Sequence, residues 1–345
     1  MLKMNIKLVA KKAGVFVATI SRAMNPETRH KVAPKTLEKI DVTVRECGYT
    51  PNIAAKNLRQ VTTKRIGVIF PYFRGIFYNS YYIHILSGVS DYLWDSPYQF
   101  KPLMLKEEKN LWEQYDFRSG ERVDGVIIIH WSKFFSVKSI VEKINVPSVV
   151  INDFDKDLRT TFVCADHYKG AQLAAEHFYK NGHRQFAVMK GSAWSKDSIV
   201  RLQGFQDYLK ALGVSIPEEL IVSADYKETD AYEQIETLLK RKKKFTALFC
   251  CNDTMAFGVL RKLEKLKIAV PEEISVIGYD DDIHSQDTRP ALTTIGVPLY
   301  QMAQTGTKLL INYLEKKNFS KPFVGVSLLP VELMERKSVC THRLI

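Results

Sequence analysis

Residues 7–24 read KLVAKKAGVFVATISRAM, a run of helix-forming residues with a single glycine in its middle. Two short helices that cross need a small residue at the crossing, a residue that tolerates a tight turn, and an apolar residue that fixes the angle. Ala10, Gly14 and Ile20 meet these needs in order. The small core is completed by Val9, Val15 and Met24. This spacing predicts a helix-turn-helix unit whose second helix covers about residues 17–24.

The second helix of this unit has a polar outer face. We expect its first turn to meet base edges in the major groove of DNA, because such helices dock in that way. The residues expected to face outward are Val17, Ala18, Ser21 and Arg22. The residues able to donate hydrogen bonds to phosphates or bases are Thr19, Ser21 and Arg22. An ordinary helical hairpin with a solvated face is the alternative interpretation.

The positive charge of the chain is concentrated at its start. Residues 1–65 hold fourteen Lys and Arg against four acidic residues, and the whole chain of 345 residues has a net charge of +12. The first 65 residues therefore carry ten of these twelve charges. A basic segment on a nearly neutral body is typical of contact with nucleic acid or an anionic membrane. A merely solvated basic surface is the alternative.

After residue 65, apolar runs alternate with amphipathic segments. The predicted strands lie at 65–70, 123–130, 147–153, 186–191, 246–253 and 274–281, with helical stretches at 169–183, 199–214 and 254–268. This alternation predicts parallel sheets covered by helices on both faces, and about six such units favour two sheets. The predicted fold class is an α-helical helix-turn-helix headpiece plus an α/β body of two doubly wound parallel-sheet lobes.

Polar residues or glycine follow several of these predicted strands. Doubly wound sheets bind ligands at the carboxyl ends of their strands. The residues at these ends include Pro71, His130, Asp153, Asn252, Asp253 and Asp280. A ligand site is therefore expected at this edge of the sheets.

Other classes of protein find little support in the sequence. No window reaches the roughly 18 apolar residues of a membrane span, and the start lacks the apolar core of a secretory signal. The five cysteines form no CxxC pair and look like small buried residues of a reducing compartment, so we expect a cytoplasmic chain with neither disulfide nor zinc. The motifs GxxxxGK[ST], HExxH and GxSxG are missing from the sequence, so we expect no enzyme, no catalytic residue and no cofactor.

Taken in order, these motifs resemble the lac/gal repressor (LacI/GalR) family of bacterial transcription regulators. The stretch KLVAKKAGVFVATISRAMN is followed by KVAPKTLEKI and CGYTPNIAAKNLR. The body adds VDGVIII, GAQLAAEHFYKNGHRQFAVMKG, RLQGFQDYL, CNDTMAFGVL, ISVIGYDD and PALTTI. The resemblance covers nearly the whole chain at family-like separations. It implies a body similar to periplasmic sugar-binding proteins.

For the DNA-binding segment the resemblance implies helices at about 6–13, 17–25 and 34–47, then a hinge helix at about 52–59. Leu58 of this hinge is the residue expected to wedge into the minor groove and kink the duplex. A linker residue packed on the body is the alternative for Leu58. The full set of expected DNA contacts is Lys7, Val17, Ala18, Thr19, Ser21, Arg22, Asn25, Tyr49, Asn52, Ala55, Lys56 and Leu58.

Two positions depart from the family pattern. Phe16 and Ala33 stand before the second and third helices, where the family has a capping Ser or Thr. Losing such a cap costs about 1 kcal/mol. We expect Phe16 to be either packed or exposed toward DNA, and the headpiece to be marginally stable before it meets DNA. A partly degenerate headpiece is the alternative.

For the body the resemblance implies a small-molecule effector, a sugar or sugar phosphate, in the cleft between two lobes. The expected effector-binding residues are Asn79, Tyr81, Tyr82, His130, Asp153, Trp194, Arg201, Asn252, Asp253 and Asp280. Tyr81 and Tyr82 have a core position as their alternative. His167, where the family more often has Asn, lies either beside the cleft or on the surface. No metal site is expected at residues 280–282, because adjacent carboxylates after a strand point in different directions.

The expected domains are a headpiece at 1–50, a hinge helix and linker at 51–65, a first lobe at 66–163 with 293–318, and a second lobe at 164–292 with 319–345. The C-terminal segment lacks the leucine heptads of a tetramerisation coil, so a homodimer is expected. We thus expect an allosteric repressor on a pseudo-palindromic operator. The alternatives are a sugar-binding protein without DNA function and a sugar-converting enzyme with a helical appendix.

Overall fold

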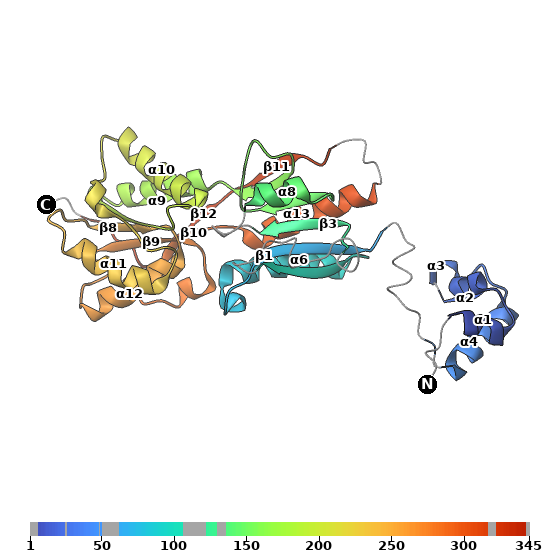
Figure 1. Cartoon of the computed structure of the whole chain (residues 1–345). Coiled ribbons are helices and arrows are strands. Elements are labelled where there is room, and N and C mark those ends of the chain that lie inside the picture. The colour runs from blue at the N-terminus through green and yellow to red at the C-terminus, as the bar shows by residue number, and fades with distance from the viewer. Residues whose placement is uncertain are drawn as a thin grey trace. The chain divides into compact units, whose positions relative to one another are not determined.

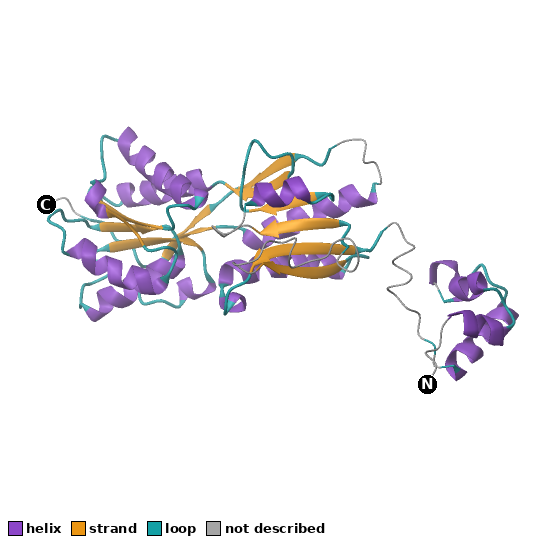
Figure 2. Ribbon diagram, viewed as in Figure 1, coloured by secondary structure: helices purple, strands orange, loops and turns teal. Residues whose placement is uncertain are grey.

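The computed structural model describes residues 6–24, 26–47, 49, 62–105, 122–129, 136–316 and 322–342. The chain divides into two compact units, residues 1–63 and 64–345. Figures 1 and 2 show that the first unit is all-helical and that the second contains two sheets flanked by helices.

The small unit begins with the predicted helix-turn-helix. Its helices are α1 (Ile6–Ala13), α2 (Val17–Ala23), α3 (Pro26–Arg29) and α4 (Pro34–Glu46). Gly14 turns the chain between α1 and α2 with φ +61°, in the left-handed region that favours glycine. The N–H of Val15 then donates to the Ala10 carbonyl at 3.0 Å, which closes the end of α1.

A compact apolar core holds these helices together. Its buried members are Val9, Ala10, Ala13, Ile20, Ala23, Val32 and Ile40. At the end of α3, Arg29 donates to the Ala23 carbonyl at 2.9 Å and to Asp41 of α4 at 3.2 Å. One side chain therefore ties the end of α2 to α4, which fixes the angle at which α2 is presented.

The first lobe of the large unit has a six-stranded, all-parallel sheet in the order β11-β5-β4-β3-β1-β2. Its strands are β1 (Arg65–Pro71), β2 (Gln99–Leu105), β3 (Gly125–Ile129), β4 (Ser148–Ile151), β5 (Thr161–Ala165) and β11 (Gly325–Leu329). Its helices are η1 (Ile76–Tyr78), α6 (Ser80–Trp94), α8 (Val137–Lys143) and α13 (Leu299–Glu315). The apolar side chains of α6 and α13 pack on one face of the sheet and those of α8 on the other.

The second lobe has a six-stranded sheet in the order β12-β10-β9-β8-β6-β7, in which only β12 runs antiparallel to its neighbour. Its strands are β6 (Phe186–Lys190), β7 (Ile221–Ser223), β8 (Ala247–Cys250), β9 (Ser275–Asp280), β10 (Thr293–Gly296) and β12 (Glu332–Met334). Its helices are α9 (His167–Lys180), α10 (Lys196–Ala211), η2 (Glu218–Leu220), α11 (Glu228–Leu239), α12 (Asp253–Lys265) and η3 (Ile283–Gln286). Figure 1 shows α9 and α10 on one side of this sheet and α11 and α12 on the other.

Two parts of the predicted lobe division are wrong. Strand β10 pairs with β9, so residues 293–296 belong to the second lobe and not to the first. Strand β11 pairs with β5, so residues 325–329 belong to the first lobe and not to the second. The physical reason is that an apolar run predicts a strand but not the sheet that the strand joins. The chain accordingly passes between the lobes after β5, after β10 and after β11.

No helix in these described ranges is long and apolar enough to cross a lipid bilayer.

Candidate functional site

Helix α2 presents a solvent-facing surface made of the predicted residues. Ala18, Ser21 and Arg22 are exposed, as is Lys7 on α1. Val17 and Thr19 are half-buried. The predicted contact residue Tyr49 is half-buried too and packs on the core of the small unit. The predicted contacts Asn25, Asn52, Ala55, Lys56 and Leu58, with the hinge helix at 52–59, lie outside the described residues.

The ends of two helices lack the caps that usually begin a helix. Phe16 precedes α2 and Ala33 precedes α4, and neither side chain makes a capping hydrogen bond. Phe16 is 83% exposed, so of the two predicted outcomes the exposed one holds. An exposed phenyl ring therefore stands at the start of α2.

The large unit contains a cavity of about 700 Å³ lined by both lobes. The first lobe contributes Asn79, Ser80, Tyr81, Tyr82, His84, Leu299, Tyr300 and Gln301 among others. The second lobe contributes Asp197, Arg201, Tyr226, Asn252, Asp253, Thr254, Asp280, Asp281 and Asp282 among others. This volume is in the range of pockets that enclose a small molecule.

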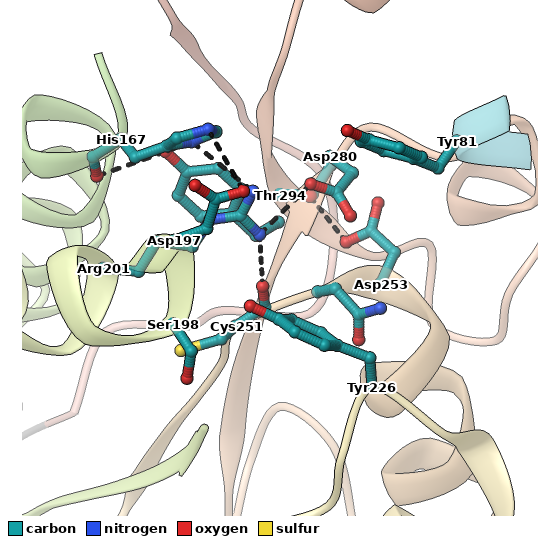
Figure 3. A network of polar contacts seen from close by, with 12 residues as sticks. Tyr81, His167, Asp197, Ser198, Arg201, Tyr226, Cys251, Asp253, Asp280 and Thr294 are labelled. Carbon is teal, nitrogen blue, oxygen red and sulfur yellow. Dashed lines mark hydrogen bonds and ion pairs between the residues drawn. The ribbon is translucent and has the colours of Figure 1, made fainter. Parts of the chain in front are cut away.

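Arg201 lines this cavity and takes part in a network of polar contacts (Figure 3). It projects from α10, is 3% exposed, and its Nη1 lies 3.2 Å from Asp280 Oδ1. Its guanidinium stacks 3.8 Å from the centroid of the Tyr279 ring and also donates to the Cys251 carbonyl. Its Nε is buried and has no hydrogen-bond partner. One donor of this lining residue is therefore not used within the described structure.

His167 joins the Arg201 cluster to the first lobe. Its Nε2 donates to Asn152 Oδ1 at 2.9 Å, and its Nδ1 accepts from Arg201 Nη2 at 3.4 Å. The amide of Asn152 donates in turn to Tyr81 Oη at 3.3 Å and to Asp197 Oδ2 at 3.4 Å. Burial and the Arg201 cation hold the pKa of His167 well below its usual value. A neutral His167 with its proton on Nε2 satisfies both contacts.

Asp253 begins α12 and is enclosed by donors. Its carboxyl accepts from the N–H of Asp282 at 2.8 Å, from Ser285 Oγ at 2.8 Å and from Thr294 Oγ1 at 2.6 Å. Burial raises its pKa to about 8, the neighbouring Asp280 adds to the rise, and the three donors oppose it. Asp253 thereby fixes the loop after β9 and the start of β10, and its oxygens are occupied within the protein.

Asp280 ends β9 in an unusual backbone conformation. Its φ is +113°, a region that L-residues rarely adopt, and Asp281 follows with φ +57°. Such backbone strain tends to be kept at binding sites. Burial raises the pKa of Asp280 to about 7, Arg201 opposes this rise, and Asp197 adds to it. The next carboxylate, Asp281, pairs with Arg336 at 2.6 Å.

Comparisons with known proteins agree with this architecture. Residues 5–52 match the model of bacterial regulatory proteins, lacI family, and residues 175–339 match that of the periplasmic binding protein-like domain. The HTH-type transcriptional regulator AscG of Escherichia coli (strain K12) is 31% identical over 323 residues, which is 91% of this chain and 93% of that protein. The chain belongs to the lacI family of bacterial regulatory proteins.

Solved structures show the same relationship. The lac repressor dimer bound to operator and the anti-inducer ONPF matches with a TM-score of 0.80 at 26% identity, over 98% of this chain and 99% of that one. A LacI family regulator from Enterococcus faecium with bound ribose matches with a TM-score of 0.69 at 25% identity, over 81% of this chain and 100% of that one. Members of the family are transcription regulators and not enzymes, so this lacI-family chain is a DNA-binding regulator.

Most predicted effector residues of this lacI-family protein line the cavity. They are Asn79, Tyr81, Tyr82, Arg201, Asn252, Asp253 and Asp280. Tyr82 is fully buried, so the core interpretation describes it better, whereas Tyr81 is half-buried. Asn252 uses its Oδ1 to cap α12, accepting from the N–H of Met255 at 2.9 Å.

Two predicted residues stand apart from this wall. Asp153 and Trp194, which were predicted to bind the effector, are not among the residues that line the cavity. Asp153 turns instead toward Lys196, with 3.5 Å between Oδ1 and Nζ, and Trp194 is 39% exposed. A polar residue after a strand need not turn inward, because the loop that follows sets its direction. His130 lies outside the described residues.

The sequence prediction missed several polar residues of this site. Asp197, Tyr226 and His84 line the cavity, and Asn152 lies behind Tyr81. Asp197 stands four residues before Arg201 on the same helix, a spacing that places two side chains on one face, so this signal was available. Tyr226 follows a short loop and carried no such signal. In the described part of the chain, no group of three or more His, Cys, Asp and Glu could hold a metal ion.

Proposed function

We propose that this protein is a repressor that binds a pseudo-palindromic operator as a homodimer and responds to a sugar. The observation that carries the DNA part is the exposed face of α2, where Ala18, Ser21 and Arg22 point to solvent in a basic unit. A short helix held in a helix-turn-helix can enter the major groove with such a face. Two-fold symmetry of the protein matches two inverted half-sites.

The interlobe cavity supports the effector part of the proposal. A ligand that contacts Tyr81 of the first lobe and Arg201 of the second stabilises the closed arrangement of the lobes. Closure then changes how the first lobes of two protomers meet, and thereby the spacing of the two headpieces on DNA. Only a difference in ligand affinity between the two arrangements is needed for this coupling. Sugars are the proposed effectors because ribose is bound in the Enterococcus faecium relative.

The DNA proposal is tested by fluorescence anisotropy with the full-length protein and a labelled duplex selected from a randomised pool. We expect tight, salt-dependent binding to an inverted repeat, with two protomers per duplex in sedimentation. Arg22→Ala should weaken binding by about tenfold to a hundredfold and relax the preference at the base it reads. Arg45→Ala, an equal loss of charge on exposed α4, is the matched control and should change binding much less.

Selection of no preferred sequence, or equal losses with both variants, would contradict the proposal. Leu58→Ala in the same assay tests the proposed minor-groove wedge separately. Its expected effect is a loss of affinity for the operator with little change in binding to random DNA.

A further inference from the structure

The cleft carries one inference beyond the proposed sugar response, on which this inference rests. We infer that the effector is an uncharged, polyhydroxylated molecule, such as a free sugar, and that its phosphorylated form is excluded. The inference comes from the charges and unpartnered atoms of the cavity wall.

Acidic side chains outnumber cationic ones in the described lining of the cavity. They are Asp197, Asp253, Asp280, Asp281, Asp282 and Glu332. Among the described lining residues the cationic side chain is Arg201, and His84 is the one histidine. A phosphate ester brings a charge of about −1.5 to −2 at neutral pH. Burial raises the pKa of Asp253 to about 8, so this acid is largely protonated at neutral pH. The remaining acids of the described lining still outnumber Arg201, so such a group would enter a site with an excess of negative charge.

The positive charge of Arg201 is already matched within the protein. Its Nη1 lies 3.2 Å from Asp280 Oδ1. Of the remaining acids, Asp281 pairs with Arg336. Among the described residues, Asp282 and Glu332 have no ion-pair partner within 4 Å, and Glu332 is exposed at the start of β12. Among the described residues of the lining, no cation is therefore left to neutralise a phosphate.

The helix ends in the second lobe also disfavour an anion. The start of a helix attracts phosphate because its N–H groups are free and its dipole is positive. Asp197 lies in the first turn of α10, and Asp253 lies in the first turn of α12. The side chains of Ser195 and Asn252 cap these two helices, so free N–H groups are fewer there and an acid stands close to each cap. Helix α6 of the first lobe has no acid in its first turn, but Asn79 places an acceptor oxygen there.

Arg201 Nε and Asn79 Oδ1 belong to lining residues and are buried without a hydrogen-bond partner in the described structure, and together they fit hydroxyl groups. Arg201 Nε is a donor, and Asn79 Oδ1 is an acceptor. A hydroxyl group donates one hydrogen bond and accepts others, so it can satisfy either atom. A phosphate oxygen can only accept at its ionised positions, so it leaves Asn79 Oδ1 unsatisfied or repelled. The rings of Tyr81 and Tyr226 add flat apolar surface in the same cavity.

The test uses full-length protein and matched pairs of probes in isothermal titration calorimetry. The pairs are ribose with ribose 5-phosphate, glucose with glucose 6-phosphate, and cellobiose with cellobiose 6-phosphate. We expect at least one neutral sugar to bind and its phosphate ester to bind at least about tenfold more weakly. Equal or tighter binding of an ester would overturn the inference and leave the proposed sugar response intact.

A charge-neutralised variant tests whether repulsion by acidic side chains causes the weaker binding of the phosphate ester. Asp282→Asn with Glu332→Gln should reduce the ratio between the affinity for the sugar and the affinity for its phosphate ester. The matched control is Glu335→Gln, because Glu335 is an exposed acid close in sequence that does not line the cavity. This variant should leave the ratio of the two affinities unchanged. If the double variant leaves the ratio of the affinities for the sugar and its ester unchanged, the inference is overturned.

Failure of all six probes to bind would overturn both the neutral-sugar inference and the sugar part of the proposed function. Operator binding in the anisotropy assay is measured separately. A positive result there would show that the error concerns only the effector and not the DNA-binding role.

Discussion

The guanidinium of Arg201 is held between Asp280, 3.2 Å from its Nη1, and the ring of Tyr279, 3.8 Å from its Cζ. Two different elements meet through this one side chain, since Arg201 lies on α10 and Asp280 ends β9. The contact also crosses from α10 to α9 through His167. Stability of the second lobe and the shape of the cleft therefore depend on the same group.

Arg201→Lys should destabilise the protein by about 2 kcal/mol, because one ammonium cannot both stack on Tyr279 and replace the forked donors. The measurement is urea unfolding followed by tryptophan fluorescence. Arg184→Lys is the control, because Arg184 also stacks on a tyrosine, Tyr179, at 3.5 Å but lies at a less buried site. That change should cost less than about 1 kcal/mol. Equal losses would show that burial of the pair is unimportant.

The free energy of unfolding should fall as pH rises above about 6.5. Burial raises the pKa of Asp253 to about 8, so its native state keeps a proton that the unfolded chain has already lost. That contribution is complete below about pH 4 and is lost as pH rises through about 8. Asp280, whose pKa is raised to about 7, acts in the same direction.

His167 changes the free energy of unfolding with pH in the opposite direction. The pKa of His167 is lowered in the native state. Below about pH 6.5 the unfolded chain therefore binds a proton at this residue, whereas the native state does not. Stability from this group is therefore lost as pH falls, which offsets Asp253 below about pH 6.5. Between pH 6.5 and 8 the fall should reach roughly 1–2 kcal/mol. Urea unfolding at several pH values should show a flatter profile in Asp253→Asn, and an identical slope would refute this assignment.

How much the sequence predicts depends on whether a feature is local. The helix-turn-helix residues Ala10, Gly14 and Ile20 act within a few residues of one another, so their spacing predicted α1 and α2 correctly. Pairing of β10 and β11 joins residues far apart in the chain, and their sheet membership was mispredicted. The same holds for the cleft, where Arg201 was expected but the contacts that link it through His167 to Asn152 come from other segments.

Restoring a cap should stabilise the small unit. Ala33 precedes α4 with φ −57° and ψ 141°, a backbone conformation that a capping serine can adopt. Ala33→Ser should add about 1 kcal/mol to the stability of this helix. Hydrogen exchange of the full-length protein should then slow about fivefold at the amides of residues 35–37. Lys31→Ser, outside the cap position, is the control, and equal slowing there would exclude capping as the cause.

A strand glycine packs directly against the buried carboxyl of Asp253. Gly278 lies in β9, and a Cβ atom at this position would overlap Asp253 Oδ1 and approach Leu292 at 2.9 Å. Asp253 cannot yield, because Ser285, Thr294 and the Asp282 N–H hold it in place. Gly278→Ala should therefore cost about 1–3 kcal/mol by overpacking, measured by urea unfolding.

Gly325 of β11 offers a matched comparison, because a Cβ atom there meets nothing within 4 Å. Gly325→Ala should be neutral or slightly stabilising, since alanine lowers the entropy of the unfolded chain. If both variants lower the free energy of unfolding equally, the loss would come from replacing any strand glycine and not from contact with Asp253. If only Gly278→Ala is destabilised, and Gly278→Ala combined with Asp253→Ser regains part of the loss, the cause is the crowding of Asp253. The carboxyl that fixes the loop after β9 would then be shown to require a glycine on the neighbouring strand.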